Sequence, residues 1–146
     1  MPNAIATPNK VTPLFALQFC LALFVILYVV FRHGALNTAR LVGLCIALPS
    51  VVLLFIARWQ LGQSFSVTPE AKELVTNGLY SKIRNPMYVF SALTLLGFVI
   101  ATQYRYAPLV LLVLVPAQLI RSHQEAKLLE ARFGDEYRQY RKGTWF

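Results

Sequence analysis

Two short segments carry most of the polar and aromatic side chains that could do chemistry in this chain. They are ELVTNGLYSKIRNPMY, residues 73–88, and RSHQEAKLLEARFGDEYRQY, residues 121–140. Each segment borders an apolar run, so its polar groups gather where an apolar helix is expected to end. Such a place suits a reaction between a small polar ligand and a substrate dissolved in lipid.

Arg121 and Glu125 form the charged pair of the second segment. Residues four apart are neighbours on a helix face, and an ion pair on the surface is the simplest interpretation. Glu125 lies within about 40° of Leu129 on the helical wheel, at the edge of an apolar stripe. A carboxylate there needs a partner, which is either Arg121 or a hydroxyl group of a ligand. His123, the possible base in this segment, points away from that edge.

The first segment has a structural and a functional interpretation. Asn85 can cap a helix that has Pro86 at its first position, and Arg84 can extend to lipid head groups. Alternatively, Asn85 and Tyr88 hold a polar ligand together with backbone donors at the helix start. The tyrosines of both segments are either interfacial aromatics or faces that attract a sulfonium or an adenine ring. They are Tyr80, Tyr88, Tyr137 and Tyr140.

The composition indicates which kind of protein positions these segments. Hydrophobic residues make up 57% of the 146 residues and charged residues 14%, whereas soluble domains carry about 25% charged residues. The charges lie between apolar blocks, as a bilayer requires. The net charge of +8 suits an anionic lipid surface better than a nucleic acid. Cys20 and Cys45 lie within apolar blocks without metal-ligand spacing, so we expect neither a metal site nor a disulfide.

The pattern predicts an all-α integral membrane protein that forms a single domain, residues 1–146, with about four transmembrane helices. A loose tail, residues 1–13, precedes apolar runs at residues 14–31, 41–57, 86–101 and 107–120. Pro49 should kink the second run. The last two runs either form a tight hairpin, or the fourth continues into the tail as one helix.

Polar elements complete the prediction. Thr68 and Pro69 should start a short helix, and Asn77-Gly78 should be a helix stop or a turn. Residues 121–140 should form an amphipathic helix that either lies on the membrane or caps the bundle, with a bend at Gly134.

The basic residues predict the orientation of the four crossings. One side of the membrane would hold eleven of them, and the other side only Arg32, Arg40 and Arg105. The eleven are Lys10, Arg58, Lys72, Lys82, Arg84, Arg121, Lys127, Arg132, Arg138, Arg141 and Lys142. Because basic residues concentrate on the cytoplasmic side, both termini and both polar segments are expected there.

Residues 60–142 resemble the isoprenylcysteine carboxyl methyltransferase family, which has phospholipid methyltransferase relatives. The first family pattern is G-x-Y followed by R-H-P-x-Y, here Gly78-Leu79-Tyr80 and Arg84-Asn85-Pro86-Met87-Tyr88. The second is an Arg, E-E-x-x-L and F-G-x-E-Y-x-x-Y. It appears here as Arg121, Glu125-Ala126, Leu129, Phe133-Gly134-Asp135-Glu136-Tyr137 and Tyr140.

The resemblance implies a membrane helix bundle with a cytoplasm-facing pocket for S-adenosylmethionine, which leaves as S-adenosylhomocysteine. By resemblance, the cofactor contacts are Lys72, Glu73, Leu74, Val75, Tyr80, Asn85, Pro86, Met87, Tyr88 and Glu125. Arg121 corresponds to the family's substrate-binding arginine. Asn85 replaces a His and cannot titrate, and Ala126 replaces the second Glu of the E-E pair.

The expected reaction is methyl transfer to a lipophilic or membrane-embedded acceptor, most simply a carboxylate. An ionised carboxylate needs no general base, and alignment of the reactants alone can supply about 7–11 kcal/mol. Arg121 could hold it with two hydrogen bonds, and Glu125 could accept from ribose hydroxyls. A thiol, phenol, amine or lipid acceptor is the alternative within enzymes.

Two other classes remain open, a non-catalytic membrane subunit and a small transporter. A proton-coupled transporter would need a membrane-embedded acid, but residues 1–69 contain no Asp or Glu.

Overall fold

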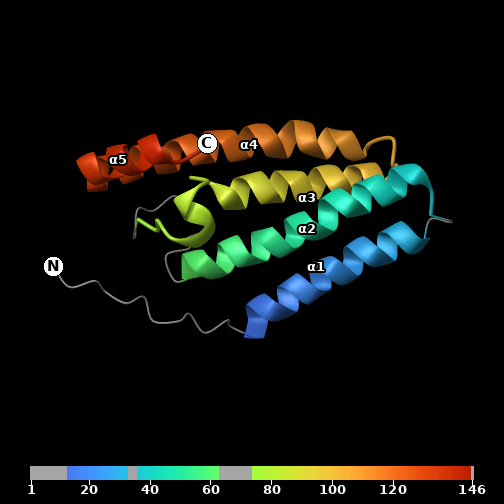
Figure 1. Cartoon of the computed structure of the whole chain (residues 1–146). Coiled ribbons are helices and arrows are strands. Elements are labelled where there is room, and N and C mark those ends of the chain that lie inside the picture. The colour runs from blue at the N-terminus through green and yellow to red at the C-terminus, as the bar shows by residue number, and fades with distance from the viewer. Residues whose placement is uncertain (1–12, 33–35, 63–73, 146) are drawn as a thin grey trace.

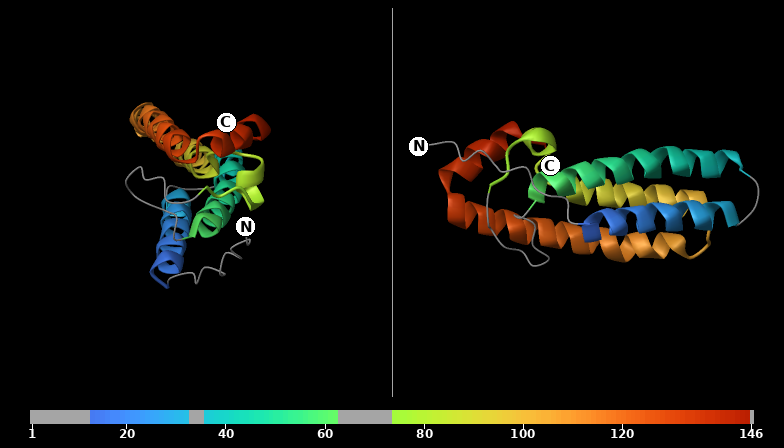
Figure 2. Two further views of the ribbon diagram at one scale, coloured as in Figure 1. Left: turned by 90° about the vertical axis from the view of Figure 1, so that its left-hand side faces the viewer. Right: turned by 90° about the horizontal axis from the view of Figure 1, so that it is seen from below.

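The computed structural model describes residues 13–32, 36–62 and 74–145. Within these ranges the chain forms helices and no β-strand, which confirms the all-α prediction for this part of the chain. The long helices run side by side and alternate in direction (Figures 1 and 2). They are α1 Pro13–Arg32, α2 Thr38–Leu61, α3 Pro86–Thr102 and α4 Ala107–Phe133; the short ones are the 3-10 helix η2 Gly78–Ser81 and α5 Asp135–Gly143.

The second helix is longer than its apolar run because polar residues complete both of its ends. Asn37 Oδ1 accepts a hydrogen bond from Arg40 N at 2.9 Å and caps the start of α2. Gly62, with φ +52, ends it and donates its N–H to Arg58 O. The helix continues through Pro49 as a single element. Among the described residues, α2 alone is both long and apolar enough to cross a membrane.

Helices α2 and α3 approach so closely that their backbones touch. A Cβ atom built on Gly43 would lie 2.6 Å from Gly97 O, and one built on Gly97 would lie 2.7 Å from Gly43 O. Ala47 and Ala101, four residues further along each helix, are completely buried. Small residues at this spacing let membrane helices pack at short distance. This contact fixes α3, whose first turn carries the candidate site.

Large apolar side chains point outward from the bundle. On α4, Leu112 is 70% exposed and Val113 is 69% exposed, and α1 exposes Phe24 and Phe31 in the same way. Contiguous exposed apolar surface of this kind marks contact with lipid or with another protein. The outer surface therefore supports association with a membrane.

The fourth apolar run and the beginning of the tail form one helix, the second of the two alternatives expected for this region. The helix ends at Gly134, whose φ of +51° is a conformation that glycine adopts at low cost. The expected bend at Gly134 is confirmed, because α5 starts directly after it.

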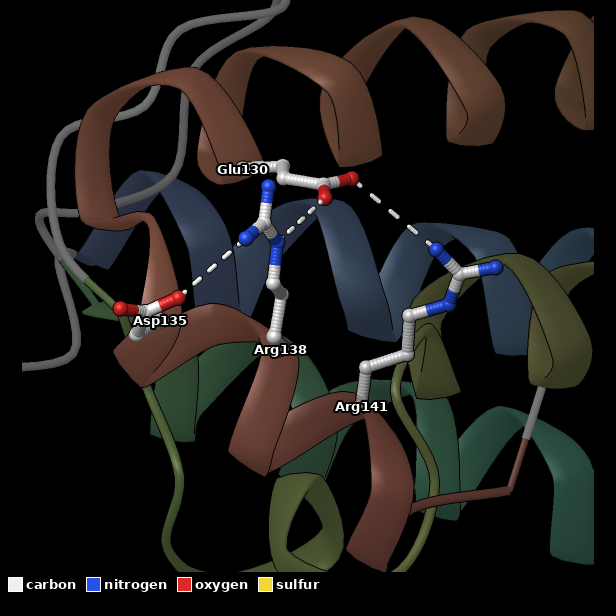
Figure 3. A network of polar contacts seen from close by, with 4 residues as sticks. All are labelled: Glu130, Asp135, Arg138 and Arg141. Carbon is white, nitrogen blue, oxygen red and sulfur yellow. Dashed lines mark hydrogen bonds and ion pairs between the residues drawn. The ribbon is translucent and has the colours of Figure 1, made fainter.

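Charged side chains hold α5 against α4 across this break (Figure 3). Arg138 Nε lies 3.0 Å from Glu130 Oε1, and its Nη1 lies 3.2 Å from Asp135 Oδ1. Arg141 Nη1 approaches Glu130 Oε2 at 3.9 Å. These groups are largely exposed, so the pairs contribute little to stability, and the pair of Arg138 with Asp135 lies within α5.

The sequence predicts two features in the polar stretch between α2 and α3, a helix start at Thr68 and a helix stop or turn at Asn77-Gly78. The helix expected to start at Thr68 lies outside the described residues. The turn at Asn77-Gly78 is present, with φ +58 at Gly78, and it leads into η2.

Candidate functional site

Four segments meet at one end of the bundle: η2, the first turn of α3, the second half of α4, and α5 (Figure 1). Tyr140 Oη of α5 donates to Tyr80 O of η2 at 2.6 Å. Trp145 N donates to Lys82 O at 2.7 Å, and Arg84 N donates to Trp145 O at 2.9 Å. The C-terminal segment is therefore bound to the chain that leads into α3.

The end of α2 positions η2. Gln60 Oε1 accepts a hydrogen bond from Leu79 N at 2.7 Å. The Gln60 side chain lies against Gly78, where any Cβ atom would overlap it. Gly78 thus satisfies two requirements at once, a positive φ and the space for Gln60.

Two hydrogen bonds join the start of α3 to α4. Tyr88 Oη donates to Glu125 Oε2 at 3.1 Å, and Asn85 Nδ2 donates to Ser122 Oγ at 2.8 Å. Asn85 occupies the cap position before Pro86, but its side chain makes no capping bond. The predicted position of Asn85 before Pro86 is thus confirmed, but the predicted side-chain cap is wrong, because the amide is directed to α4.

Glu125 is largely buried, and burial raises the pKa of its carboxyl above the usual value. The hydrogen bond from Tyr88 and the positive charge of Arg121 act in the opposite direction, with smaller effect. The expected surface ion pair between Arg121 and Glu125 is wrong. Among the described residues Arg121 forms no ion pair or hydrogen bond through its side chain. Glu125 is turned toward α3, so the half-buried guanidinium of Arg121 is left available for an anion.

The tyrosines of this end are more buried than interfacial aromatics. Tyr80 is 7% exposed, and its pKa is raised first by burial and then by the nearby charge of Glu125. Burial also raises the pKa of Tyr140 to about 12. Both phenols are therefore neutral near pH 7, and the neutral Tyr140 phenol can donate to the backbone oxygen of Tyr80. The interfacial interpretation is wrong for Tyr80 and Tyr137, which is 1% exposed.

Two buried polar atoms of this region have no hydrogen-bond partner among the described residues. They are Tyr137 Oη and Arg84 Nε. The charge of Arg84 acts on Tyr137 and on Tyr140, so the guanidinium lies close to α5. The Nε of Arg84 is therefore turned into the bundle, whereas the extension of this half-buried side chain to lipid head groups stays a prediction.

The remaining candidate residues are placed less specifically. Leu74 and Val75 are half-buried in the irregular segment before η2. Pro86 is fully buried in the first turn of α3, and Met87 beside it is half-buried. Lys72 and Glu73 lie outside the described residues.

Sequence patterns missed the polar partners on α4. Ser122 receives the bond from Asn85, and Gln118 Nε2 donates to Ser91 Oγ of α3 at 3.0 Å. The available signal was the spacing of Gln118, Ser122 and Glu125, which places all three on one helix face. Polar residues on one face of an otherwise apolar helix indicate a polar contact within the bundle.

The charges of this end suit a ligand that carries both polar hydroxyls and an anion. Glu125 uses only Oε2 in its bond to Tyr88, so Oε1 can accept from a hydroxyl group. The basic residues Arg84 and Arg121 flank the same region, and their charges act on its tyrosines and on Glu125. Glu125 with the aromatic faces fits a nucleoside sulfonium, and the arginines fit an anionic partner.

Comparison with known proteins gives one family. The sequence matches the family model described as phospholipid methyltransferase over residues 34–136. The match includes α2, α3 and α4, so it begins further toward the N-terminus than the resemblance at residues 60–142. No curated protein and no solved structure matches the chain. Because the match takes in well over half of the sequence, the chain belongs to the phospholipid methyltransferase family.

Proposed function

We propose that this chain transfers a methyl group from S-adenosylmethionine to a carboxylate of a lipophilic acceptor. Family membership implies membrane methyltransferase activity. The observation that carries the finer proposal is the arrangement of two charged residues on α4. Glu125 is bonded to Tyr88, whereas Arg121, one helical turn away, keeps its guanidinium unpaired among the described residues.

On this proposal the donor lies against η2 and the first turn of α3. Glu125 accepts from the ribose hydroxyls through Oε1, as acidic residues do in other nucleotide sites. Tyr80 and Tyr88 supply aromatic faces for the adenine ring or the sulfonium. The remaining proposed contacts are Lys72, Glu73, Leu74, Val75, Asn85, Pro86 and Met87. When bound, the donor supplies a methyl group on a positively charged sulfur.

The acceptor carboxylate is held by Arg121 in this proposal. A guanidinium can bind both carboxylate oxygens in one plane and thereby orient the nucleophile. An acceptor oxygen forms the new bond to the methyl carbon, while the pair of the broken carbon–sulfur bond stays on sulfur. No proton moves, so the reaction needs no titrating group at Asn85. Alignment of the reactants supplies the main part of the rate gain.

The proposed placement in the membrane follows the alternating direction of the helices. We infer four crossings by α1, α2, α3 and the apolar half of α4, with both termini and the site on the cytoplasmic side. Helix α3, with 17 residues, is short for a perpendicular crossing. The exposed apolar faces would then contact membrane lipids, and a lipophilic acceptor would reach the site from the bilayer.

The family description makes a phospholipid amine the second candidate acceptor. The arginines at this end would attract the phosphate of such a lipid but repel its reacting amine, which is a protonated ammonium group near pH 7. A carboxylate, in contrast, is attracted by the positive charges of the same arginines. Charge complementarity therefore favours the anionic acceptor.

Calorimetric titration of S-adenosylhomocysteine into purified protein in detergent or nanodiscs tests the donor site. We expect micromolar affinity for the wild type and a loss of at least tenfold for Glu125→Ala. Glu130→Ala is the matched control, because the Glu130 carboxylate lies on the same helix but, within the described ranges, pairs only with Arg138 and Arg141. Equal affinities of the two variants, or no binding by folded wild type, would contradict the proposed site.

A further inference from the structure

Gln118 is a polar residue within the apolar half of α4, and its orientation can be worked out from the hydrogen bonds around it. Its side chain is half-buried and faces α3, where it contacts Ser91. An amide placed among apolar residues of a membrane helix is unfavourable unless it forms hydrogen bonds. The contact with Ser91 satisfies one part of the amide.

The hydrogen bonds of Ser91 show whether the NH₂ group or the carbonyl oxygen of Gln118 faces it. Ser91 Oγ donates its single hydrogen to Tyr88 O at 3.0 Å, so toward Gln118 it can only accept. The group of Gln118 that faces Ser91 must therefore be the NH₂, as the 3.0 Å contact from Nε2 has it. The carbonyl oxygen Oε1 has no hydrogen-bond partner among the described residues.

The position of this free acceptor relates it to the proposed reaction. Gln118 lies three residues before Arg121 and seven before Glu125, so all three share the helix face that is turned to α3. Side chains three residues apart on a helix have their Cβ atoms about 5–6 Å apart. A small group bound by Arg121 can therefore reach Gln118 with a donor on a neighbouring atom.

We propose that Gln118 Oε1 is a specificity-determining subsite, which accepts a hydrogen bond from an N–H or O–H beside the methylated group of the acceptor. The inference rests on the proposed function, because it assumes that the acceptor binds at Arg121. The subsite would select acceptors that carry an N–H or O–H donor. Arg121 cannot make this selection, since a guanidinium contains only donors. Acceptors with a donor next to the carboxylate are preferred over those with hydrocarbon there.

The test compares two acceptors that differ only in the donor. One is S-farnesyl-N-acetylcysteine, which has an amide N–H next to its carboxylate, and the other is its ester analogue 2-acetoxy-3-(farnesylthio)propanoate, in which an oxygen atom replaces that N–H. The wild type should favour the first by about five- to tenfold in kcat/KM and in binding affinity, the effect of one hydrogen bond. Gln118→Leu should reduce this ratio to near one by weakening the first acceptor.

Ser91→Ala is the matched control, because it removes the same contact between α3 and α4 but keeps the Gln118 amide, whose Oε1 can still turn to a donor of the acceptor. It should retain most of the preference. Loss of the preference in both variants would mean that Gln118 only joins the helices and would overturn the subsite. An unchanged ratio in Gln118→Leu, or no preference in the wild type, would overturn it as well.

Titration with S-adenosylhomocysteine separates this failure from failure of the proposed function. If S-adenosylhomocysteine binds but neither acceptor binds, the subsite at Gln118 and the proposal of a carboxylate acceptor both fail. The proposed donor site is then still supported. If S-adenosylhomocysteine itself does not bind to the folded protein, the proposed function fails as a whole.

Discussion

Tyr88 Oη donates to Glu125 Oε2 across the contact between α3 and α4, with 3.1 Å between the two atoms. The phenol is held by the first turn of α3, where Tyr88 N donates to Asn85 O. The carboxylate is held on α4, next to Ser122, which receives the bond from Asn85. The position of Glu125 therefore depends on how α3 begins, and this dependence can be measured.

The first prediction concerns the coupling of this pair. Tyr88→Phe and Glu125→Ala should each change the free energy of unfolding, but the double variant should lose less than the sum of both. Residues that share a hydrogen bond typically show coupling energies of about 0.5–3 kcal/mol. Thermal unfolding in one detergent gives all four corners of the cycle. Additive effects would mean that the bond contributes nothing to the folded state.

The second prediction concerns pH. Burial raises the folded-state pKa of Glu125 above its ordinary value of 4.5, so ionisation is harder in the folded than in the unfolded chain. Its contribution to stability is then fully present below the ordinary pKa and is lost as pH rises through the raised folded-state pKa. Glu125→Gln cannot ionise and should gain stability relative to the wild type across this interval. Unfolding midpoints measured in steps from pH 4 upward check this, and a difference that shrinks with rising pH would refute it.

The third prediction separates binding of the acceptor from binding of the donor. Arg121→Ala should raise KM for a lipophilic carboxylate by about 10- to 100-fold, the range for a charge-assisted hydrogen bond. Affinity for S-adenosylhomocysteine should stay within about twofold. Arg121→Lys should recover only part, because an ammonium cannot hold both oxygens in the same way. Lys127→Ala, an exposed change on the same helix, is the control. If Arg121→Ala weakens the affinity for S-adenosylhomocysteine more than it raises KM for the acceptor, Arg121 binds the donor instead of the acceptor.

Sequence patterns predict what depends on neighbours along the chain. The apolar run at residues 86–101 predicts α3, Pro86–Thr102, to within one residue, and Gly134 predicts the break before α5. Local rules failed where a side chain had two possible partners. Asn85 had a nearby helix to cap and Glu125 had Arg121 at the ideal spacing, and both instead bond residues 37 positions away.

The failed predictions share one physical cause. A local partner is preferred in a sequence argument because no loop has to close to bring it near. The close packing of α2 with α3 and the run of α4 beside α3 had already brought the distant partners together. Once those helices pack, bonds across them shield a carboxylate better than a surface ion pair does.

The fourth prediction concerns Tyr137, which is 1% exposed and whose hydroxyl has no partner among the described residues. A buried hydroxyl without a bond is unfavourable by about 1–3 kcal/mol, so Tyr137→Phe should leave stability unchanged or raise it. Tyr137→Ala should lower it by about 3–5 kcal/mol through the cavity left behind. Tyr140→Phe, which loses a 2.6 Å bond to Tyr80 O, should cost about 0.5–1.5 kcal/mol. Equal losses in the two Phe variants would show that the Tyr137 hydroxyl is bonded.

The fifth prediction concerns the contact that places α3. Gly97→Ala puts a Cβ atom 2.5 Å from Ala47 N and 2.7 Å from Gly43 O, so the helices must move apart. We expect a loss of about 1–3 kcal/mol in stability, as for other overpacked sites. Helix propensity alone predicts the opposite, because alanine favours a helix over glycine by about 1 kcal/mol. Gly143→Ala, where the added atom meets nothing within 4 Å, is the matched control and should not lower stability. If Gly97→Ala is as stable as that control, α2 and α3 are not in backbone contact, and the placement of Tyr88 against Glu125 needs another cause.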